Sequence, residues 1–505
     1  MNRLIQKNIL TLSVVLIIMI FAFCIFSCRK LVNIAPPSYQ IADNNVYSSD
    51  ATAIAVLTGM YTSMNSSAGP FTGTKSIHLL AGLGADELIA YSGSVAVLQS
   101  YYQNSLTPFG ASMSGTEHWS PLYNYLLKSN AVIEGLTSTE ANALTPAVKQ
   151  QLLGEAKFMR AFFYFYLINL FGDVPLALTT DPKINALLGR APLEQVYEQI
   201  INDLNDAKEL LSSNFLDATL LKTSVERVRP TKFAAEAFLA RVYLYTGEWA
   251  KAEEEATEVI SNTALFNLSS LNNAFLKASL GNKEAIWQLQ PTTLFFNTQE
   301  AINFIIPQTG PNNGSQPVYL SRQILKSFEA GDNRAKYGNW VDTTIYKVNA
   351  TTQDTVSYVN KYKLNVRDTT INASTGTAKM KEFLMMLRLG EQYLIRAEAR
   401  AHLGKIPEAQ SDLNTTRARA GLPGITPTDK TSLLAAILKE KQVELFCESG
   451  HRWLDLKRTG NINAVMSLVT PLKANGAPWQ LYQAFYPLPQ SDLDKAPNLV
   501  QNLGY

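Results

Sequence analysis

One short stretch, residues 444–460 (ELFCESGHRWLDLKRTG), collects the residue types that enzymes use for chemistry. It contains carboxylates, a histidine, a cysteine and several cations close together. Such a set could supply a general acid, a general base and a nucleophile. The first question about function is therefore whether this stretch is an active site.

Helical periodicity offers another explanation for the acidic residues. Glu440, Glu444 and Glu448 recur every fourth residue, which predicts that they form one stripe of a helix. The residues predicted to face the core from the same helix are Val443, Phe446 and Cys447. A buried cysteine in an apolar run is usually structural rather than reactive.

The pair Ser449-Gly450 is predicted to break this helix, and a second short amphipathic turn follows. Arg452 has two predicted partners, Asp455 three residues later or the glutamate stripe before the break. Either pairing would make a polar clamp around the helix break. We interpret the stretch as a structural clamp rather than as the place where a ligand binds.

Other catalytic patterns do not occur in the sequence. It contains no GxSxG, HExxH or CxxC motif, and its histidines, at 78, 118, 402 and 451, lack zinc-ligand spacing. Asp86 and Glu87 are adjacent, so they cannot face one glycosidic bond from two sides. A carboxylate pair from distant positions stays open, but we predict no catalytic residue, no metal and no cofactor.

The N-terminus predicts export. A basic start precedes an apolar run at 9–26, which is typical of a signal peptide, although an uncleaved membrane anchor is an alternative. The run ends in Ile25-Phe26-Ser27-Cys28, which resembles the lipobox of bacterial lipoproteins. We therefore predict a lipoprotein signal peptide at 1–27, lipidation of Cys28 and a tether at 28–45.

Composition narrows the class of protein. The chain has 505 residues, 46% of them hydrophobic, so it can bury a large core. After cleavage before Cys28, Cys447 would be the one remaining cysteine, so no intramolecular disulfide is predicted. A formal net charge of +2 argues against a nucleic-acid partner.

Apolar residues at helical spacing predict helices at 51–64, 118–136 and 193–211, and a long aromatic helix that begins at 154, is ended by Gly172 and is stopped by Pro175. Segment 77–102 is predicted to be loop with short helical pieces, because glycines interrupt it.

Two segments follow the tetratricopeptide pattern, in which small residues let paired helices approach and a glycine makes the turn. In the first, 231–260, the matching positions are Ala240, Tyr243, Gly247, Trp249 and Ala252. In the second, the matching positions are Ala397, Gly404, Ile406 and Ala409. Since repeats stack on neighbours, we predict a helical-repeat scaffold mainly at 146–265 and 387–460.

The pattern changes between the repeats. A short strand is predicted at 284–290, a Gly-, Pro- and Asn-rich loop at 295–317, and a hairpin where TTIYKV and TVSYV flank NATTQD. These features predict an irregular, partly β lobe mainly at 70–115 and 268–381. Irregular excursions of this kind often carry binding residues.

Several long motifs, in order, resemble the SusD/RagB family of outer-membrane nutrient-binding lipoproteins. They are WSPLYNYLLKSNAVI, GEAKFMRAFFYFYLINLFGDVPL, GDNR (331–334), LIRAEARAHLG, LNTTRARAG, ELFCESGHRWLDLKRTG and FYPLPQSDLDKAPNLVQNLGY. The resemblance implies a mainly α fold, with a tetratricopeptide-like helical-pair scaffold and a less regular, partly β ligand-binding lobe, in one body at 46–505. It also implies a binding role without catalysis.

The resemblance implies the partners as well. They are a SusC-like TonB-dependent transporter, a glycan or peptide ligand, and the outer membrane through the lipid anchor, with the protein facing the cell exterior. Arg29 and Lys30 follow Cys28 where many exported relatives have acidic residues. A periplasm-facing repeat scaffold for a protein partner therefore stays an alternative, as does a peptide ligand, whereas a hydrolase is disfavoured.

Aromatic residues in irregular segments are the candidates for ligand contact. A flat ring buries the C–H face of a sugar while amides and carboxylates bind its hydroxyl groups. The candidates are Tyr91, Tyr101, Tyr102, Gln103, Asn104, Phe295, Phe296 and Trp340. For each of them ordinary core packing is the alternative. The aromatics assigned to the core, because they lie on helical stripes or repeat positions, are Trp119, Phe158, Phe162, Tyr243 and Trp249.

Overall fold

Helices form most of the chain, as the spacing of apolar residues predicted. The structure is a computed structural model that describes residues 43–505 apart from 67–68, 111–112, 294, 373 and 376–378. Helices account for 49% of it and strands for 8%, so the fold is mainly α, as predicted. Cys28 and the predicted signal peptide lie outside the described residues, so their assignment stays a prediction.

Helix α6 (Pro146–Phe171) is the central helix of the first half of the chain. Its first turn holds a proline, which fits because the missing N–H would have had no helical partner there. Gly172 ends it at a φ of 77°, in the left-handed region that favours glycine. The helix starts before the predicted 154, because Pro146 marks a start that the aromatic stripe alone does not reveal.

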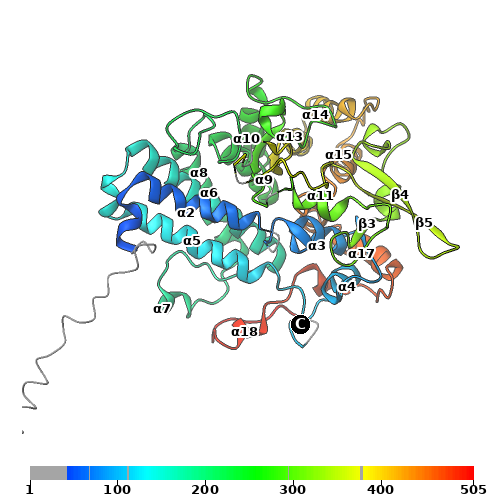
Figure 1. Ribbon diagram of the computed structural model, residues 1–505, viewed down its shortest axis with the longest axis horizontal. Helices are drawn as coiled ribbons and strands as arrows, with labels where there is room; N and C mark the ends of the chain where they lie inside the picture. Colours follow the sequence, from blue (N-terminus) through cyan, green and yellow to red (C-terminus); the bar gives the residue numbers. More distant parts are fainter. Residues whose placement is uncertain (1–42, 67–68, 111–112, 294, 373, 376–378) are drawn as a thin grey trace, which may run out of the picture. The chain divides into compact units, whose positions relative to one another are not determined.

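Three predicted helices pack against α6 (Figure 1). They are α2 (Asp50–Met64), α5 (Trp119–Thr137) and α8 (Leu193–Leu210), and α2 also contacts α5. The side chain of Ser49 caps α2 by accepting a hydrogen bond from the backbone N–H of Thr52. The predicted bounds of these three helices agree with the structure to within one or two residues.

Both predicted repeat pairs are present. Their helices are α9 (Lys232–Thr246) with α10 (Trp249–Ser261), and α13 (Leu389–His402) with α14 (Ile406–Arg419). Gly247 and Gly404 make the two turns, each at a φ of 78°. Helix α10 packs on α13, and α15 (Lys430–Glu444) packs on α13 and α14. The pairs are therefore neighbours in space, although the irregular segments separate them in sequence.

Strands pair in three antiparallel two-stranded sheets within the described residues. The pairs are β1 (Leu88–Ala90) with β3 (Val318–Leu320), β2 (Ala285–Leu289) with β6 (Leu384–Arg388), and β4 (Val341–Lys347) with β5 (Gln353–Val359). The register from Val341 opposite Val359 to Lys347 opposite Gln353 confirms the predicted hairpin. The strand predicted at 284–290 is β2.

Short helices connect the larger elements. Two of them, with β1 between, occupy the segment predicted as loop with helical pieces: α3 (Ile77–Gly84) and α4 (Ala96–Gln103). The prediction that 295–317 is a loop is wrong, because this segment contains α11 (Gln299–Phe304). The hydroxyl group of Thr298 caps α11 by accepting a hydrogen bond from the backbone N–H of Ala301. The other short helices are α7 (Pro182–Asn185), α12 (Arg322–Leu325), α16 (His451–Arg458), α17 (Ile462–Val469) and α18 (Gln490–Leu493).

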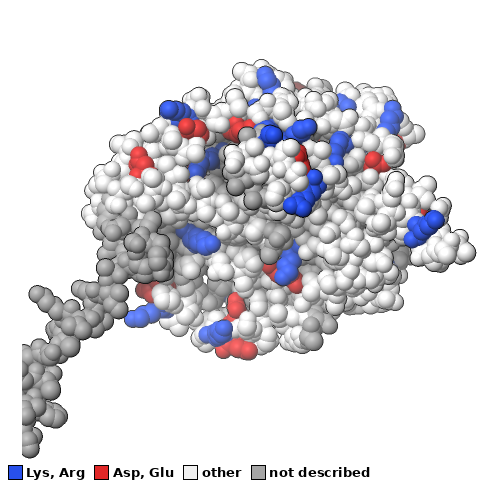
Figure 2. Space-filling model, viewed as in Figure 1, with Lys and Arg blue, Asp and Glu red and all other residues white. Residues whose placement is uncertain are grey.

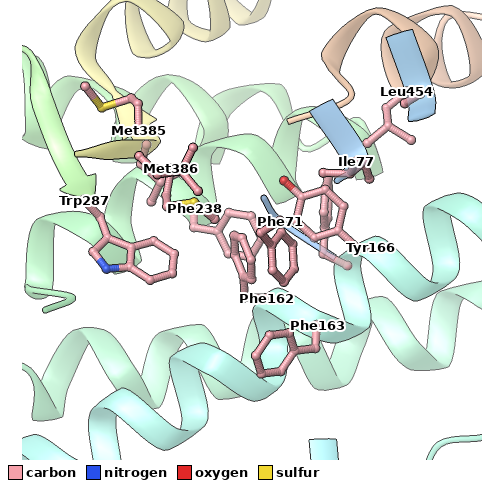
Figure 3. Packing of buried hydrophobic residues seen from close by; sticks show 14 of the residues in the cluster. Phe71, Ile77, Phe162, Phe163, Tyr166, Phe238, Trp287, Met385, Met386 and Leu454 are labelled. Atoms are coloured by element: carbon pink, nitrogen blue, oxygen red, sulfur yellow. The ribbon is translucent and has the colours of Figure 1, made fainter. Parts of the chain in front are cut away.

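The centre of the core is aromatic (Figure 3). The ring of Phe162 lies 5.3 Å, between centroids, from each of Phe71, Phe238 and Trp287. Its contact with Trp287 is edge-to-face, the arrangement that ring quadrupoles favour. Because these rings come from α6, α9, β2 and the segment before α3, they join the helical layers to the strands.

Four of the five aromatics assigned to the core are buried, as predicted: Trp119, Phe158, Phe162 and Tyr243. Trp249 differs, because its side chain is half-buried and its ring stacks on His402 with 3.8 Å between centroids. Trp249 and His402 line a pocket, so this repeat position faces a groove rather than the centre of the core.

Residues Tyr47–Tyr505 form one compact unit. The boundaries at 27 and 45, and the division between repeat scaffold and lobe, stay predictions. Among the helices of the described residues, none has the length and apolar character that crossing a membrane requires.

Candidate functional site

Glutamates at and around the start of the 444–460 stretch lie in a buried cluster of ion pairs, the ion cluster. Its centre is Glu444, whose carboxylate lies 2.9 Å from Arg334 and 2.5 Å from Arg388 and also pairs with Arg419. Burial opposes ionisation of Glu444, but Arg419, Arg388 and Arg334 outweigh it and hold its pKa well below the usual value. The ion cluster comprises Glu284, Arg334, Lys361, Arg388, Arg419, Glu440, Glu444 and Glu448.

The ion cluster brings together three of the motifs that carry the family resemblance. Arg334 belongs to the GDNR motif, Arg419 to LNTTRARAG, and Glu444 to the stretch 444–460. Arg334 also donates to Glu440 at 2.6 Å. These charges are fully or almost fully buried, so each needs its partners in place. The motifs therefore fix the contact between α14, α15 and the segments of the irregular lobe.

Helix α15 ends earlier than predicted. Its last residue is Glu444, and Glu448 lies in the turn that follows. Cys447 and Ser449 have φ values of 53° and 49°, and residues in this left-handed region do not continue an α-helix. The prediction of one helical stripe that includes Glu448 is therefore wrong in extent, although Glu448 still joins the ion cluster.

Lys361 holds this turn in place. Its ammonium group donates to the carbonyl oxygens of Glu444 at 3.0 Å and Phe446 at 2.8 Å, and it pairs with the carboxylate of Glu448. The backbone N–H of Ser449 donates to Nδ1 of His78 at 2.9 Å. The turn is thus clamped by residues distant in sequence, Lys361 and His78, and not by the predicted pairs of Arg452.

Arg452 does not pair with either predicted partner. It donates to both oxygens of Asp86, at 2.8 and 2.7 Å, whereas Asp455 accepts from Arg458 at 2.7 Å. The prediction is wrong because α3 contacts α16 and brings Asp86 beside Arg452 across 366 sequence positions. Residue spacing carries no information about such a contact.

The possible base and nucleophile of the stretch are neutral. Burial lowers the pKa of His451 to about 4, against the opposing effect of Glu391 at 3.9 Å. Burial, and then Glu87, raise the pKa of the Cys447 thiol well above its usual value. Burial, and then Asp86, raise the pKa of Glu87 to about 8. Near neutral pH the thiol and the imidazole of the segment, and the carboxyl group of Glu87 that contacts the N–H of Cys447, are therefore all buried and uncharged.

Tyr101 and Asn104, two predicted ligand residues, are buried. Tyr101 is 1% exposed, and its hydroxyl group donates to Glu117 at 2.7 Å. Asn104 donates to the carbonyl oxygen of Gly84 at 2.9 Å and accepts from the ammonium group of Lys473 at 3.0 Å. Both side chains thus have partners inside the protein.

Trp340 is fully buried. Its indole N–H donates to the carbonyl oxygen of Leu271 at 2.8 Å. The guanidinium group of Arg419 and the ammonium group of Lys361 lie 5.0 and 4.8 Å from its ring centroid. In this structure its ring therefore forms a wall of the ion cluster.

Phe295, Phe296 and Gln103 are half-buried. The guanidinium group of Arg367 lies 4.4 Å from the ring centroid of Phe295. Phe295 has a φ of 71°, and its carbonyl oxygen accepts from the N–H of Asp368 at 2.7 Å. The role of these three residues in binding stays a prediction.

Tyr91, Tyr319 and Tyr346 are half-buried and come from three separate segments. Tyr91 follows β1, and its N–H donates to the carbonyl oxygen of Pro317 at 2.8 Å, next to the β1–β3 pair. The ring of Tyr346, from β4, lies against Gly310, where a Cβ atom would come within 2.2 Å of it. The strands and the 305–317 loop thus fix the positions of these rings.

Tyr102, another predicted ligand residue, is buried at 6% exposure, and it lines one cleft together with Ile89, which lies opposite Tyr319 in the β1–β3 pair. Burial, followed by the effects of Tyr102, Tyr346 and Asp354, raises the pKa of Tyr319 to about 12. The hydroxyl group of Tyr346 donates to Asp354 at 3.3 Å; burial, then Asp354 and Tyr91, raise its pKa. We call Tyr91, Tyr102, Tyr319 and Tyr346 the tyrosine face.

The tyrosine face offers flat apolar rings beside phenol hydroxyl groups, with the carboxylate of Asp354 at its edge. Two of its members, Tyr91 and Tyr102, were among the predicted residues. Tyr319 and Tyr346 were missed. For Tyr346 a signal existed, because the hairpin register places it directly opposite Asp354. The short strand of Tyr319 gives no comparable pattern.

The described residues include no group of three or more His, Cys, Asp or Glu that could hold a metal ion. Figure 2 shows Lys and Arg scattered with Asp and Glu over a mostly uncharged face. That distribution differs from the single-sign stripe of proteins that bind nucleic-acid backbones.

Two family models match the chain. The model described as the SusD family matches residues 238–505, and the model described as starch-binding, associating with the outer membrane, matches residues 83–244. Together they include both repeat pairs, the ion cluster and the tyrosine face.

Individual relatives agree with these matches. The chain is 28% identical to a SusD-like protein of Formosa agariphila, over 76% of this chain and 79% of the relative. It is 25% identical to the starch-binding protein SusD of Bacteroides thetaiotaomicron, over 76% of each chain. A solved structure named as a laminarin-binding SusD-like protein superposes with a TM-score of 0.68 at 23% identity, over 90% of this chain and 99% of that one.

Proposed function

The chain belongs to the SusD family, and from that premise we propose that it is a binding protein for an oligosaccharide. The observation that supports this most directly is the tyrosine face, in which β1, β3 and the β4–β5 hairpin bring aromatic rings and hydroxyl groups together. Rings of this kind bury the C–H face of a sugar, and neighbouring polar groups bind its hydroxyls. Relatives named for starch and laminarin binding support the same ligand class.

We propose that the protein binds without catalysis. The carboxylates and cations of the 444–460 stretch pair with one another or with distant residues, and its histidine and cysteine are neutral. These groups stabilise the turn and are therefore not available for catalysis. Two of the relatives named above are described as binding proteins, for starch and for laminarin.

For location, we propose an outer-membrane lipoprotein anchored through Cys28 and facing the cell exterior. The support is the lipobox-like Ile25-Phe26-Ser27-Cys28 and the family description that names association with the outer membrane. We further propose that the protein delivers its ligand to a SusC-like TonB-dependent transporter. Protease added to intact cells should remove the protein if it faces outward, and should leave it intact if it is a periplasm-facing scaffold.

Calorimetry tests the ligand class and the site together. The protein truncated before the tether should bind at least one glycan from a panel, and Tyr346→Ala should weaken that binding roughly five- to tenfold through loss of one ring face. Tyr393→Ala is the matched control, because Tyr393 is a half-buried tyrosine on α13 of the repeat scaffold. Binding of peptides but of no glycan would reject the proposed ligand class. Equal affinity of Tyr346→Ala and wild type would reject the proposed site.

A further inference from the structure

A cleft of about 550 Å³ lies next to the tyrosine face. Tyr102 and Ile89 line it, and Ile89 lies directly opposite Tyr319 in the β1–β3 pair. Directly opposed residues share one side of a sheet, so the cleft and the tyrosine face are continuous. Leu88 and Leu472 give the cleft an apolar wall, while Arg322 and Lys326 of the α12 segment line its other side.

Two of the four charged side chains that line this cleft, Asp86 and Lys473, have partners inside the protein. The carboxylate of Asp86 pairs with Arg452 at 2.7 Å. The ammonium group of Lys473 donates to Leu83 and Gly84 carbonyl oxygens, both at 2.8 Å, and to Asn104. An ammonium group has three N–H donors, so those of Lys473 are all in use.

Arg322 and Lys326 differ from these groups. Both side chains are exposed, and within the described part of the chain neither has an ion-pair or hydrogen-bond partner. They are four residues apart at α12, so both lie on the same side of it. Two like charges on one side of a short helical segment repel, and an anion in the cleft would relieve that repulsion. We call this cleft the cationic cleft.

We propose that the cationic cleft binds the anionic group of a carboxylated or sulfated sugar, so that the ligand of the tyrosine face is an acidic oligosaccharide. This inference rests on the proposed function and names its ligand class. The cleft holds two unpaired cations beside an apolar wall and an aromatic ring, which matches a sugar that has an acidic substituent on one edge and C–H groups on its face. A neutral glycan would leave both cations without a counter-charge.

The test compares acidic saccharides with their matched neutral forms by calorimetry. One arm uses oligogalacturonates and their methyl esters, and the other uses carrageenan oligosaccharides and their desulfated forms. The acidic form in at least one arm should bind about tenfold more tightly than its neutral form, and the difference should shrink as salt rises. The arm that responds identifies the anion as carboxylate or sulfate.

A pair of charge-matched variants locates the effect. The double variant Arg322→Gln, Lys326→Gln should lose the preference for the acidic form while it keeps binding to the neutral form. The control is Lys128→Gln, Lys183→Gln, which removes the same charge from exposed positions on α5 and α7 and should keep the preference. All four side chains are exposed, and circular dichroism and melting temperature should show that both variants fold.

The outcomes separate this inference from the proposed function. If neutral glycans bind as tightly as acidic ones, or if both double variants lose the preference equally, the acidic ligand is rejected and glycan binding stands. If no saccharide of the panel binds but poly-glutamate does, both proposals are rejected. Loss of the preference in Arg322→Gln, Lys326→Gln alone supports the cationic cleft.

Discussion

The ion cluster and the cationic cleft are both assembled from distant segments, and both contain arginine, lysine and carboxylates. They differ in whether the charges have partners. In the ion cluster, Arg388 contacts Glu284, Glu444 and Glu448, and the group is almost fully buried. In the cleft, Arg322 and Lys326 are exposed and unpaired among the described residues.

The difference separates residues that hold the fold from residues available to a ligand. A buried charge with a full set of partners stabilises one arrangement of the chain and has no capacity left for a ligand. An exposed charge beside a cleft contributes little to stability, and it can bind a ligand. The acidic and basic residues of the 444–460 stretch, which looked most like an active site, belong to the residues that hold the fold.

The largest expected effect comes from breaking the ion cluster. Arg388→Met should lower the free energy of unfolding by about 3–5 kcal/mol, because it leaves Glu444 and Glu448 buried without one of their main partners. Urea denaturation followed by circular dichroism measures this change. The matched variant Arg322→Met, in the cleft, should change stability by less than about 0.5 kcal/mol. Equal losses in the two variants would contradict the distinction drawn between the two regions.

As pH falls, protonation of the buried histidines should destabilise the fold before protonation of Glu448 in the ion cluster does. Burial lowers the pKa of His78, His118 and His451 to about 4. Between their unfolded pKa of about 6.5 and this value, the unfolded chain binds more protons, so stability falls as pH falls through that window. The pKa of Glu448 is lowered to about 2, so its contribution is lost only as pH falls from about 4.5 toward 2.

Melting temperatures measured from pH 7 downward check this order. We expect the melting temperature to start falling near pH 6.5 as the free energy of unfolding decreases, with each of the three histidines costing up to about 3 kcal/mol by pH 4, and the decline should be shallower in His451→Gln. A stability that stays flat to pH 4 would show that these histidines are protonated in the folded protein.

The position of the tyrosine face depends on one glycine. In Gly310→Ala the new Cβ would collide with the ring of Tyr346, so ligand affinity should fall several-fold, in addition to about 1 kcal/mol of stability for the positive φ of 85°. Gly281→Ala is the control, because Gly281 has a φ of 86° but nothing within 4 Å of its Cβ position. It should lose similar stability and keep its affinity, as measured by calorimetry. If both variants lost affinity, the cause would be the strain of a positive φ on the backbone rather than displacement of the Tyr346 ring.

The sequence predicted those parts of the fold that depend on local spacing. The repeat turns at Gly247 and Gly404, the hairpin at 341–359 and the core positions on α6 all follow from periodicity or from residues that favour one conformation. These features involve residues that are close in sequence. Their physical cause is therefore visible in the sequence itself.

Pairing between distant residues was not predictable in the same way. Asp86 binds Arg452, and the residue spacing suggested other partners. Trp340 lies in a segment that resembles a binding loop, yet it packs inside the ion cluster. Tyr346 joins the tyrosine face because the hairpin packs on β3. Each outcome depends on which elements meet in space, and one sequence does not contain that information.

The smallest expected effect concerns Tyr101, which could belong either to the residues that hold the fold or to those that contact the ligand. Tyr101 was predicted to contact the ligand, but its hydroxyl group donates to Glu117 at 2.7 Å and its side chain is 1% exposed. Tyr101→Phe removes that hydrogen bond and keeps the ring, so it should cost about 1 kcal/mol of stability and leave ligand affinity unchanged. Urea denaturation and calorimetry measure the two quantities on the same sample. A loss of affinity without a loss of stability would instead assign Tyr101 to the ligand, and would require the segment around it to open when the ligand binds.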